Sequence, residues 1–179
     1  MEPALIQRLR QMFGVELEGL TGASISGEIP LTNELINGFI AQRLAAAQGV
    51  VAAAHVDAQD EDHIGVELSM RGPRMLPSVR MVARIEQQPE LPHPAVLGLR
   101  WSIPGMGPLG LFAAPALTWL KALPPGIRAE GDWIVVDIAE ALRSQGLGEL
   151  LRYLSKLRIH TRRGVVVVQF ELRIGAASR

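Results

Sequence analysis

The chain has 179 residues, no cysteine, and 18 basic and 18 acidic residues that cancel to a formal net charge of zero. This length fits one domain with a sizeable core, and the lack of cysteine excludes disulfides, thiolate zinc sites and thiol catalysis. Nucleic-acid binders usually carry a basic excess and aromatic residues for stacking. With balanced charge and only 4% aromatic residues, we expect no nucleic-acid partner.

The low share of charged residues, 20%, is the second constraint. It lies below the usual quarter, which indicates a lightly charged surface or one covered by a partner or ligand. No uninterrupted apolar run reaches the length of about 18 residues that a membrane-spanning helix needs. The start, Met1 to Ala4, lacks the basic and apolar regions of a signal peptide. We expect a cytoplasmic protein, or a chain that begins after a removed leader.

The first predicted elements are two helices with a strand between them. Residues 1–14 have the spacing of a short amphipathic helix, which could be an appendage to a single domain over residues 1–179. Residues 24–29 alternate as a strand. The clearest helix begins at Thr32 or Asn33, which would cap it, and ends before a glycine at position 49. Its wide apolar stripe and few charges predict burial on most sides and a central position.

Strands dominate the rest of the chain, with a few short helices among them. Four successive strands are predicted: residues 50–56 are apolar and small, and residues 64–70, 79–85 and 97–103 alternate with period two. Later elements are a short helix at residues 116–123 and a strand at 133–136. The capping box of Asp137 and Glu140 begins a helix at 137–143, and one or two further helical turns follow at 147–153. A long hairpin at 156–174 turns at Arg163-Gly164.

Strands that follow one another through turns form an antiparallel sheet. We therefore expect an α+β fold in which a long, curved antiparallel sheet wraps around one apolar helix, with short extra helices.

Two histidines and several carboxylates fall within residues 55–63. His55, Asp57, Asp60 and His63 could ligate a metal ion, which would suit a metal-dependent hydrolase. Their spacing matches neither a helical histidine pair nor a calcium loop, and an acidic solvated turn between two strands is the simpler interpretation. The chain also has no frame for nucleophilic catalysis and no phosphate-binding loop. We therefore expect neither an enzyme nor a cofactor.

Basic residues recur at every second position of the first hairpin strand, at Lys156, Arg158, His160 and Arg162. This spacing places them on one face of the strand. There they could meet the anionic headgroups of a membrane surface or an acidic partner. Alternatively they form a solvated outer face whose cross-strand partners include Glu171.

The segment 104–115 is rich in glycine and proline yet contains no polar residue. Because loops are usually polar, Leu109 and Phe112 could belong to a lid over a lipid cavity or to a loop that dips into a bilayer. The segment could equally pack onto the core or form an oligomer contact. Trp101 and Trp119 fit core positions whose indole nitrogens bond to carbonyls, and they could also line a pocket.

One segment resembles a known family. Over residues 26–37 a short strand leads into Ile29-Pro30-Leu31-Thr32 and then into a helix with an Ile36-Asn37 pair. This pattern resembles bacterial members of the tubular lipid-binding superfamily, relatives of bactericidal/permeability-increasing protein. Residues 123–127, followed by a strand, are similar to the same domains. The resemblance, which covers residues 20–174 loosely, implies a long helix wrapped by a curved antiparallel sheet with lipid in the apolar groove between them.

Together these patterns favour non-enzymatic binding of a lipid or other apolar ligand in a groove between helix and sheet. The residues that we expect to line the groove are large and apolar: Leu35, Phe39, Ile40, Leu99, Trp101, Leu109, Phe112 and Trp119. The alternative is a protein-interaction or scaffold domain, which could be a homo-oligomer. It would use the apolar loop 104–115 and the basic strand 156–162.

Overall fold

The computed structural model describes residues 22–46, 51–70, 78–91, 94–104 and 126–174. The predicted helices over 1–14 and 116–123, and nearly all of the apolar loop, lie outside these residues. The elements in chain order are β1 (Ala23–Thr32), α2 (Asn33–Ala46), β2 (Val51–Ala58), β3 (His63–Met70), β4 (Val79–Gln87), β5 (Val96–Ser102), β6 (Ile127–Glu130), β7 (Trp133–Asp137), α4 (Ile138–Ser144), the 3-10 helix η4 (Gly148–Arg152), β8 (Leu154–Arg162) and β9 (Val165–Ile174).

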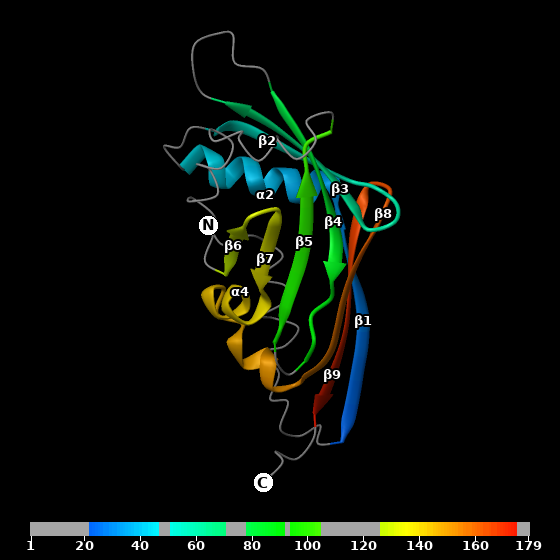
Figure 1. Ribbon diagram of the computed structural model, residues 1–179. Helices are drawn as coiled ribbons and strands as arrows, with labels where there is room; N and C mark the ends of the chain where they lie inside the picture. The colour runs from blue at the N-terminus through cyan, green and yellow to red at the C-terminus, as the bar shows by residue number, and fades with distance from the viewer. Residues whose placement is uncertain (1–21, 47–50, 71–77, 92–93, 105–125, 175–179) are drawn as a thin grey trace.

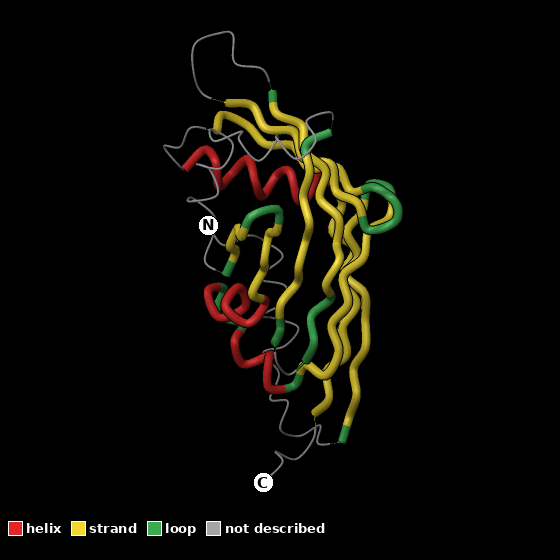
Figure 2. The backbone as a smooth tube through the Cα atoms, in the orientation of Figure 1, coloured by secondary structure: helices red, strands yellow, loops and turns green. Residues whose placement is uncertain are grey.

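The strands form two antiparallel sheets (Figure 1). One sheet has three strands in the order β1-β9-β8, and the other has six in the order β2-β3-β4-β5-β7-β6. The strands curl together into a half-barrel, with α2 and α4 on the same side of it (Figure 2). The predicted α+β class and its antiparallel strands are therefore confirmed. Among the strands of the described residues, the short β6 alone was not predicted.

The core lies between the inner faces of the two sheets. Its buried residues come from β3, β4, β5 and β8: Leu68, Met81, Ala83, Ile85, Leu97, Leu99, Trp101 and Ile159. Because side chains alternate along a strand, the intervening charged residues point to the outer face. Glu67 and Arg80, for example, form an exposed ion pair at 3.2 Å across β3 and β4.

The capping and turn signals in the second half of the chain are confirmed. Asp137 caps α4, since its Oδ1 accepts a hydrogen bond of 2.9 Å from the backbone N–H of Glu140. The helical turn predicted after Leu147 is η4. Gly164 has a φ of 79° in the β8–β9 turn, a left-handed conformation that glycine adopts without strain.

Helix α2 begins where the sequence predicts, but it is not buried on most sides. Thr32 is its cap, because its Oγ1 accepts a hydrogen bond of 3.3 Å from the N–H of Leu35. Leu35 and Phe39 are 46% and 40% exposed, and the buried core cluster contains no residue of α2. The helix lies beside β2, at one edge of the six-stranded sheet (Figure 1). A sheet wrapped around a buried apolar helix is thus not confirmed.

The turn between β2 and β3 holds two residues with positive φ, Glu61 at 58° and Asp62 at 62°. Such a pair is typical of a type I′ turn, which favours asparagine, aspartate and glycine. Glutamate lacks a short side chain that tolerates this conformation. We expect Glu61→Asn to raise the free energy of unfolding in urea by about 0.5 to 1 kcal/mol. Glu61→Ala removes the same charge, but alanine does not favour a positive φ. An equal rise in the free energy of unfolding from this variant would contradict the explanation.

Candidate functional site

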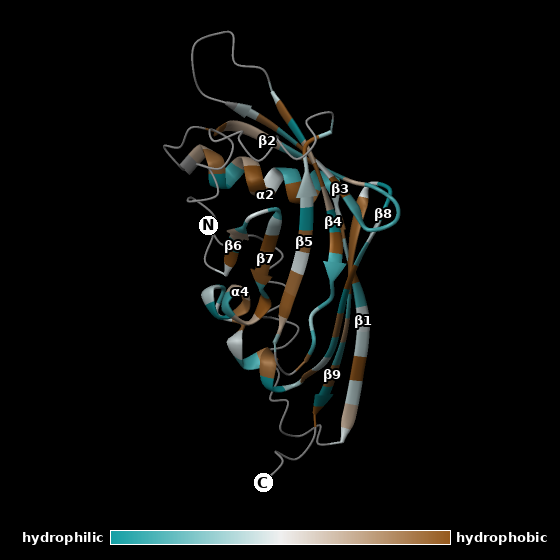
Figure 3. Cartoon of the chain, in the orientation of Figure 1, coloured by the Kyte–Doolittle hydropathy of each residue, from teal (hydrophilic) through white to brown (hydrophobic). Residues whose placement is uncertain are grey.

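The inner face of the three-stranded sheet carries no charged residue along its described length. Its side chains alternate with those of the outer face, which are polar apart from Pro30, Val165 and Val167, and Figure 3 shows the alternation as bands along β1. From β1, β9 and β8 they are Ala23, Ile25, Gly27, Ile29, Leu31, Val166, Val168, Phe170, Leu172, Ile174, Leu157, Ile159 and Thr161. In the six-stranded sheet the corresponding face holds the core cluster. The two inner faces therefore form one uncharged surface within the half-barrel.

Part of this surface is incompletely covered. At the end of β9, Leu172 and Ile174 are only 2% and 3% exposed. In contrast, Ile25 is 36% exposed, and Ile29, Leu31 and Phe170 are half-buried. We call these four residues the open inner strip. An apolar surface of this kind, left accessible beside a packed core, could contact an apolar ligand.

Gly27 brings the aromatic ring of the strip close to β1. A Cβ atom at this position would lie 3.0 Å from Cζ of Phe170, the residue opposite it on β9. The ring therefore lies directly over the glycine, where any side chain would displace it.

Two of the predicted groove residues belong to the core. Leu99 and Trp101 are 9% and 7% exposed and pack in the cluster between the sheets. The indole Nε1 of Trp101 donates a hydrogen bond of 3.2 Å to the carbonyl oxygen of Gly131. The predicted bond between an indole and a carbonyl is therefore confirmed for this tryptophan.

The predicted groove residues of α2 lie elsewhere. Leu35 and Phe39 are on the exposed side of the helix, where the guanidinium of Arg43 lies 5.2 Å from the centroid of the Phe39 ring. Ile40 is half-buried. The structure therefore does not bring the helix and core residues of the predicted groove into one lining. Leu109, Phe112 and Trp119 lie outside the described residues.

The predicted basic row does occupy the outer face of β8. Lys156, Arg158 and Arg162 are exposed and His160 is half-buried, while the residues between them point inward. Lys156 lies opposite Glu171. A hydrogen bond from Arg173, followed by the charges of Arg173 and Lys156, lowers the pKa of Glu171. The outer face is thus partly neutralised within its own sheet.

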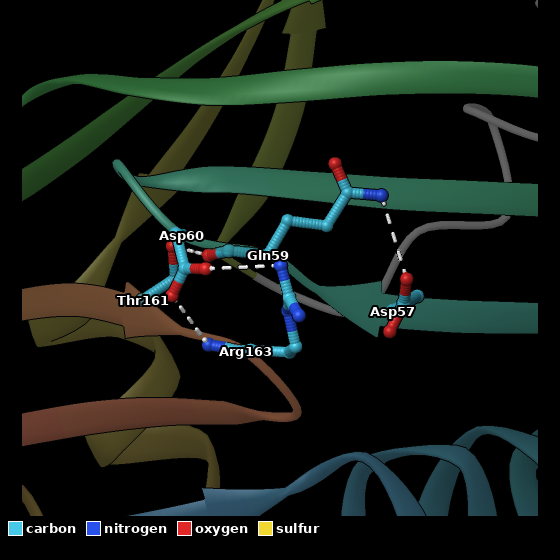
Figure 4. Close-up of polar contacts among 5 residues, drawn as sticks. All are labelled: Asp57, Gln59, Asp60, Thr161 and Arg163. Carbon is cyan, nitrogen blue, oxygen red and sulfur yellow. Dashed lines mark hydrogen bonds and ion pairs between the residues drawn. The ribbon is translucent and has the colours of Figure 1, made fainter.

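The acidic segment 55–63 does not form a metal site in the part of the chain that the structure describes, since no three potential ligands converge there. The carboxylates hold backbone and side chains together instead, as Figure 4 shows for two of them. Asp57 accepts hydrogen bonds of 2.8 Å from Asn33 and 3.4 Å from Gln59. Asp60 accepts one of 3.0 Å from the N–H of Arg163 and also faces its guanidinium at 3.6 Å.

These contacts belong to a wider pattern, in which side chains cover the free edge of β8. The amide of Gln88 bonds to both backbone groups of Ile159, donating at 2.6 Å and accepting at 2.9 Å. Asp62 Oδ1 accepts a hydrogen bond of 2.9 Å from the N–H of Thr161. These side chains replace the neighbouring strand that β8 lacks on this side.

The edge of β2 is covered in the same way, by asparagines of α2. The amide of Asn37 donates to the carbonyl of Val56 at 2.8 Å and accepts from its N–H at 2.7 Å. Four residues earlier, Asn33 accepts from the N–H of Ala58 at 2.9 Å. Four helical residues rise about 6.0 Å and two strand residues about 6.6 Å, so the two spacings match. The sequence predicts no such role for either asparagine.

Thr161 joins the two sheets through its hydroxyl group. Its side chain is buried, and Oγ1 donates to the carbonyl oxygen of Gln59 in the β2–β3 turn (Figure 4). We expect Thr161→Val to lower the free energy of unfolding by about 1 to 2 kcal/mol, because the carbonyl loses its donor in a part-buried place. Urea unfolding measures the change, and Thr161→Ser is the control that keeps the hydroxyl. Equal losses in both variants would indicate packing rather than this bond.

Comparison with known proteins found no family, no curated protein and no solved structure that matches this chain. Among the described residues, no helix is both long enough and apolar enough to span a bilayer. The open inner strip and the exposed side of α2 are therefore the features from which a function can be inferred.

Proposed function

We propose that this protein binds a lipid or another apolar molecule along the open inner strip, without catalysing a reaction on it. The observation that carries the proposal is an uncharged inner face of which one part is packed as core while Ile25, Ile29, Leu31 and Phe170 stay accessible. The resemblance of residues 26–37 to tubular lipid-binding domains supports the same function. The ligand would then lie along β1, in place of the groove between helix and sheet expected from the sequence.

The energetics favour a long, flexible ligand. Each methylene group that leaves water contributes about 0.8 kcal/mol, so an acyl chain gains affinity by covering several side chains at once. The strip extends along β1 from Ile25 to Leu31, six residue-to-residue steps or about 20 Å of strand. Charged or compact polar ligands would find no partner on it.

Native mass spectrometry of the purified protein, with organic extraction of the same sample, tests the proposal. A co-purifying mass that extraction releases as a fatty acid or phospholipid is the expected result. A clean apo mass that added fatty acid and phospholipid do not shift would overturn it.

A matched pair of glutamine substitutions locates the binding surface. Ile29 is on the inner face of β1, and the adjacent Glu28 is exposed on the outer face. We expect Ile29→Gln to weaken binding of a neutral probe, Nile red, about tenfold, because it puts an amide into the apolar contact. Glu28→Gln should leave the affinity unchanged, since its side chain lies on the other face. Fluorescence titration measures both, and equal effects would place the ligand elsewhere.

A second candidate is protein binding through the exposed side of α2. Leu35 and Phe39 present apolar surface, and Arg43 stacks near the aromatic ring. Aromatic residues and arginine are frequent at the centres of protein interfaces. A protein that carries no lipid and takes up none would favour this function.

A further inference from the structure

One long edge strand in the described structure is left without a cover. Side chains bond to outward backbone groups of Val56 and Ala58 in β2 and of Ile159 and Thr161 in β8, as shown above, and β6 has only four residues. β1 has ten residues and forms the other edge of the three-stranded sheet, at the margin of the molecule in Figure 2. Ser24, Ile25, Ser26, Glu28 and Pro30 are all exposed. Proteins usually protect an edge of this length from pairing with another strand.

The hydrogen-bond pattern shows which residues of β1 point outward. Ile159 directs both backbone groups to Gln88 and hence away from β9. In an antiparallel ladder the direction alternates with each residue, so Val168, opposite Ile159, bonds to β1 instead. Its partner there is Ile29, whose backbone N–H and C=O groups therefore point toward β9. The backbone groups of Ser24, Ser26 and Glu28 consequently point away from β9, and no described residue bonds to them.

A second hydrogen bond agrees with this pattern, in which the odd-numbered residues direct their backbone groups toward β9. The N–H of Asn33, just after β1, donates to the carbonyl of Gly164 at 2.9 Å. Pro30 falls on an outward position, where its missing N–H breaks no bond within the sheet. The free edge can therefore pair only over the part of β1 that precedes this proline.

We infer that two copies of this chain pair through β1, antiparallel and across a twofold axis at Ser26. In this register Ser26 lies opposite the partner's Ser26, and Ser24 opposite the partner's Glu28. A hydroxyl then faces a carboxylate, no like charges are opposed, and the proline stays outside the pairing. The outward N–H and C=O groups of these three residues all find partners.

The side chains of the two inner faces also meet across this pairing. Ile25, the most exposed residue of the open inner strip, lies opposite the partner's Gly27, over which the ring of the partner's Phe170 lies, so one apolar side chain faces another. The two three-stranded sheets join into one sheet whose uncharged inner face is continuous. This pairing does not require a ligand on the strip, so it stands independently of the proposed function.

Cysteine scanning tests the register, because the chain has no cysteine of its own. Residues opposite each other in a hydrogen-bonded pair have Cα atoms about 5.5 Å apart, within the range of a disulfide. We expect Ser26→Cys to form a covalent dimer under mild oxidation. Ser24→Cys should remain monomeric on a denaturing gel, because its two copies lie about 13 Å apart along the strands. Equal cross-linking of both variants, or none of either, would overturn the register.

Sedimentation of the unmodified chain and two variants tests the pairing itself. Edge pairing is a small interface, so we expect a dimer that dissociates on the order of micromolar. Ser26→Pro removes the central outward N–H and should weaken the dimer on the order of a hundredfold. Ser26→Lys places two cations opposite each other in the dimer, yet in the monomer it faces Glu171, so it should still fold. Ser102→Lys, on the exposed face of β5, is the charge control.

A chain that stays monomeric well above the micromolar range would overturn the inference, as would a dimer that survives both substitutions at Ser26. Far-UV circular dichroism of each variant separates loss of pairing from loss of folding.

Discussion

Replacing Gln88 with alanine should lower the free energy of unfolding by about 2 to 4 kcal/mol. The amide of this residue is the partner of both backbone groups of Ile159, which is 8% exposed and belongs to the core cluster. Without it, a buried N–H and a buried C=O are left unsatisfied, and each costs about 1 to 3 kcal/mol. Few single substitutions outside a core have effects of this size. Urea unfolding gives the free energy, and amide hydrogen exchange at Ile159 gives the local effect.

The neighbouring glutamine provides the control. Gln87, the last residue of β4, is exposed. Gln87→Ala should change the free energy of unfolding by less than about 0.5 kcal/mol. If the two alanine variants were equally stable, the bidentate contact of Gln88 would not hold β8 in solution. A loss of stability without faster exchange at Ile159 would likewise place the effect elsewhere.

The second large effect is expected at Asn37. Asn37→Ala removes both hydrogen bonds to Val56 and should cost about 2 kcal/mol, since these groups are part-buried. Alanine favours the helix by roughly half a kcal/mol over asparagine, so the measured loss understates the contact. We expect faster amide exchange at Val56 and Ala58 together with the lower stability. Retained protection there would show that α2 is held by other contacts.

Gln42→Ala is the matched change on α2, because Gln42 is exposed and takes part in no described hydrogen bond. It should raise stability slightly through helix propensity. If Asn37→Ala lowers the free energy of unfolding while Gln42→Ala raises it, the loss at Asn37 comes from the bonds between α2 and β2 and not from helix propensity.

Most of the fold follows from local signals in the sequence. The strands from β3 to β5 and the final hairpin alternate with period two, and Asp137 stands three residues before Glu140. Such signals need only near neighbours along the chain, which explains why they are reliable. β6 escapes prediction because four residues with two charges are too few to show alternation.

The placement of α2 is different, because it depends on groups far along the chain. Its apolar composition predicts burial, yet the helix is attached to β2 through the amides of Asn33 and Asn37. Asn33 fits a helix cap equally well, and nothing near Asn37 in the sequence indicates an edge strand about twenty residues later. A polar contact that needs two separate elements in register leaves no periodic signal.

The contacts of the acidic turn could not be predicted for the same reason. Asp60 and Asp62 bond to Arg163 and Thr161, about a hundred residues later in the chain. From the sequence their carboxylates are indistinguishable from ligands or from solvated turn residues. The open inner strip could be predicted only in part, since alternation gives the inner face of β1 but not how far the rest of the protein covers it.

The contact between Asn37 and Val56 also has a chemical consequence over time. Asn37 is followed by Gly38, and an asparagine before glycine loses its amide readily when the backbone nitrogen of the glycine can reach the side chain. The helix and the bonds to Val56 hold the two apart, so the residue is protected while α2 stays attached. Each local detachment exposes it. The resulting aspartate cannot donate to the Val56 carbonyl, and a reversible opening therefore becomes permanent damage that accumulates with the age of the molecule.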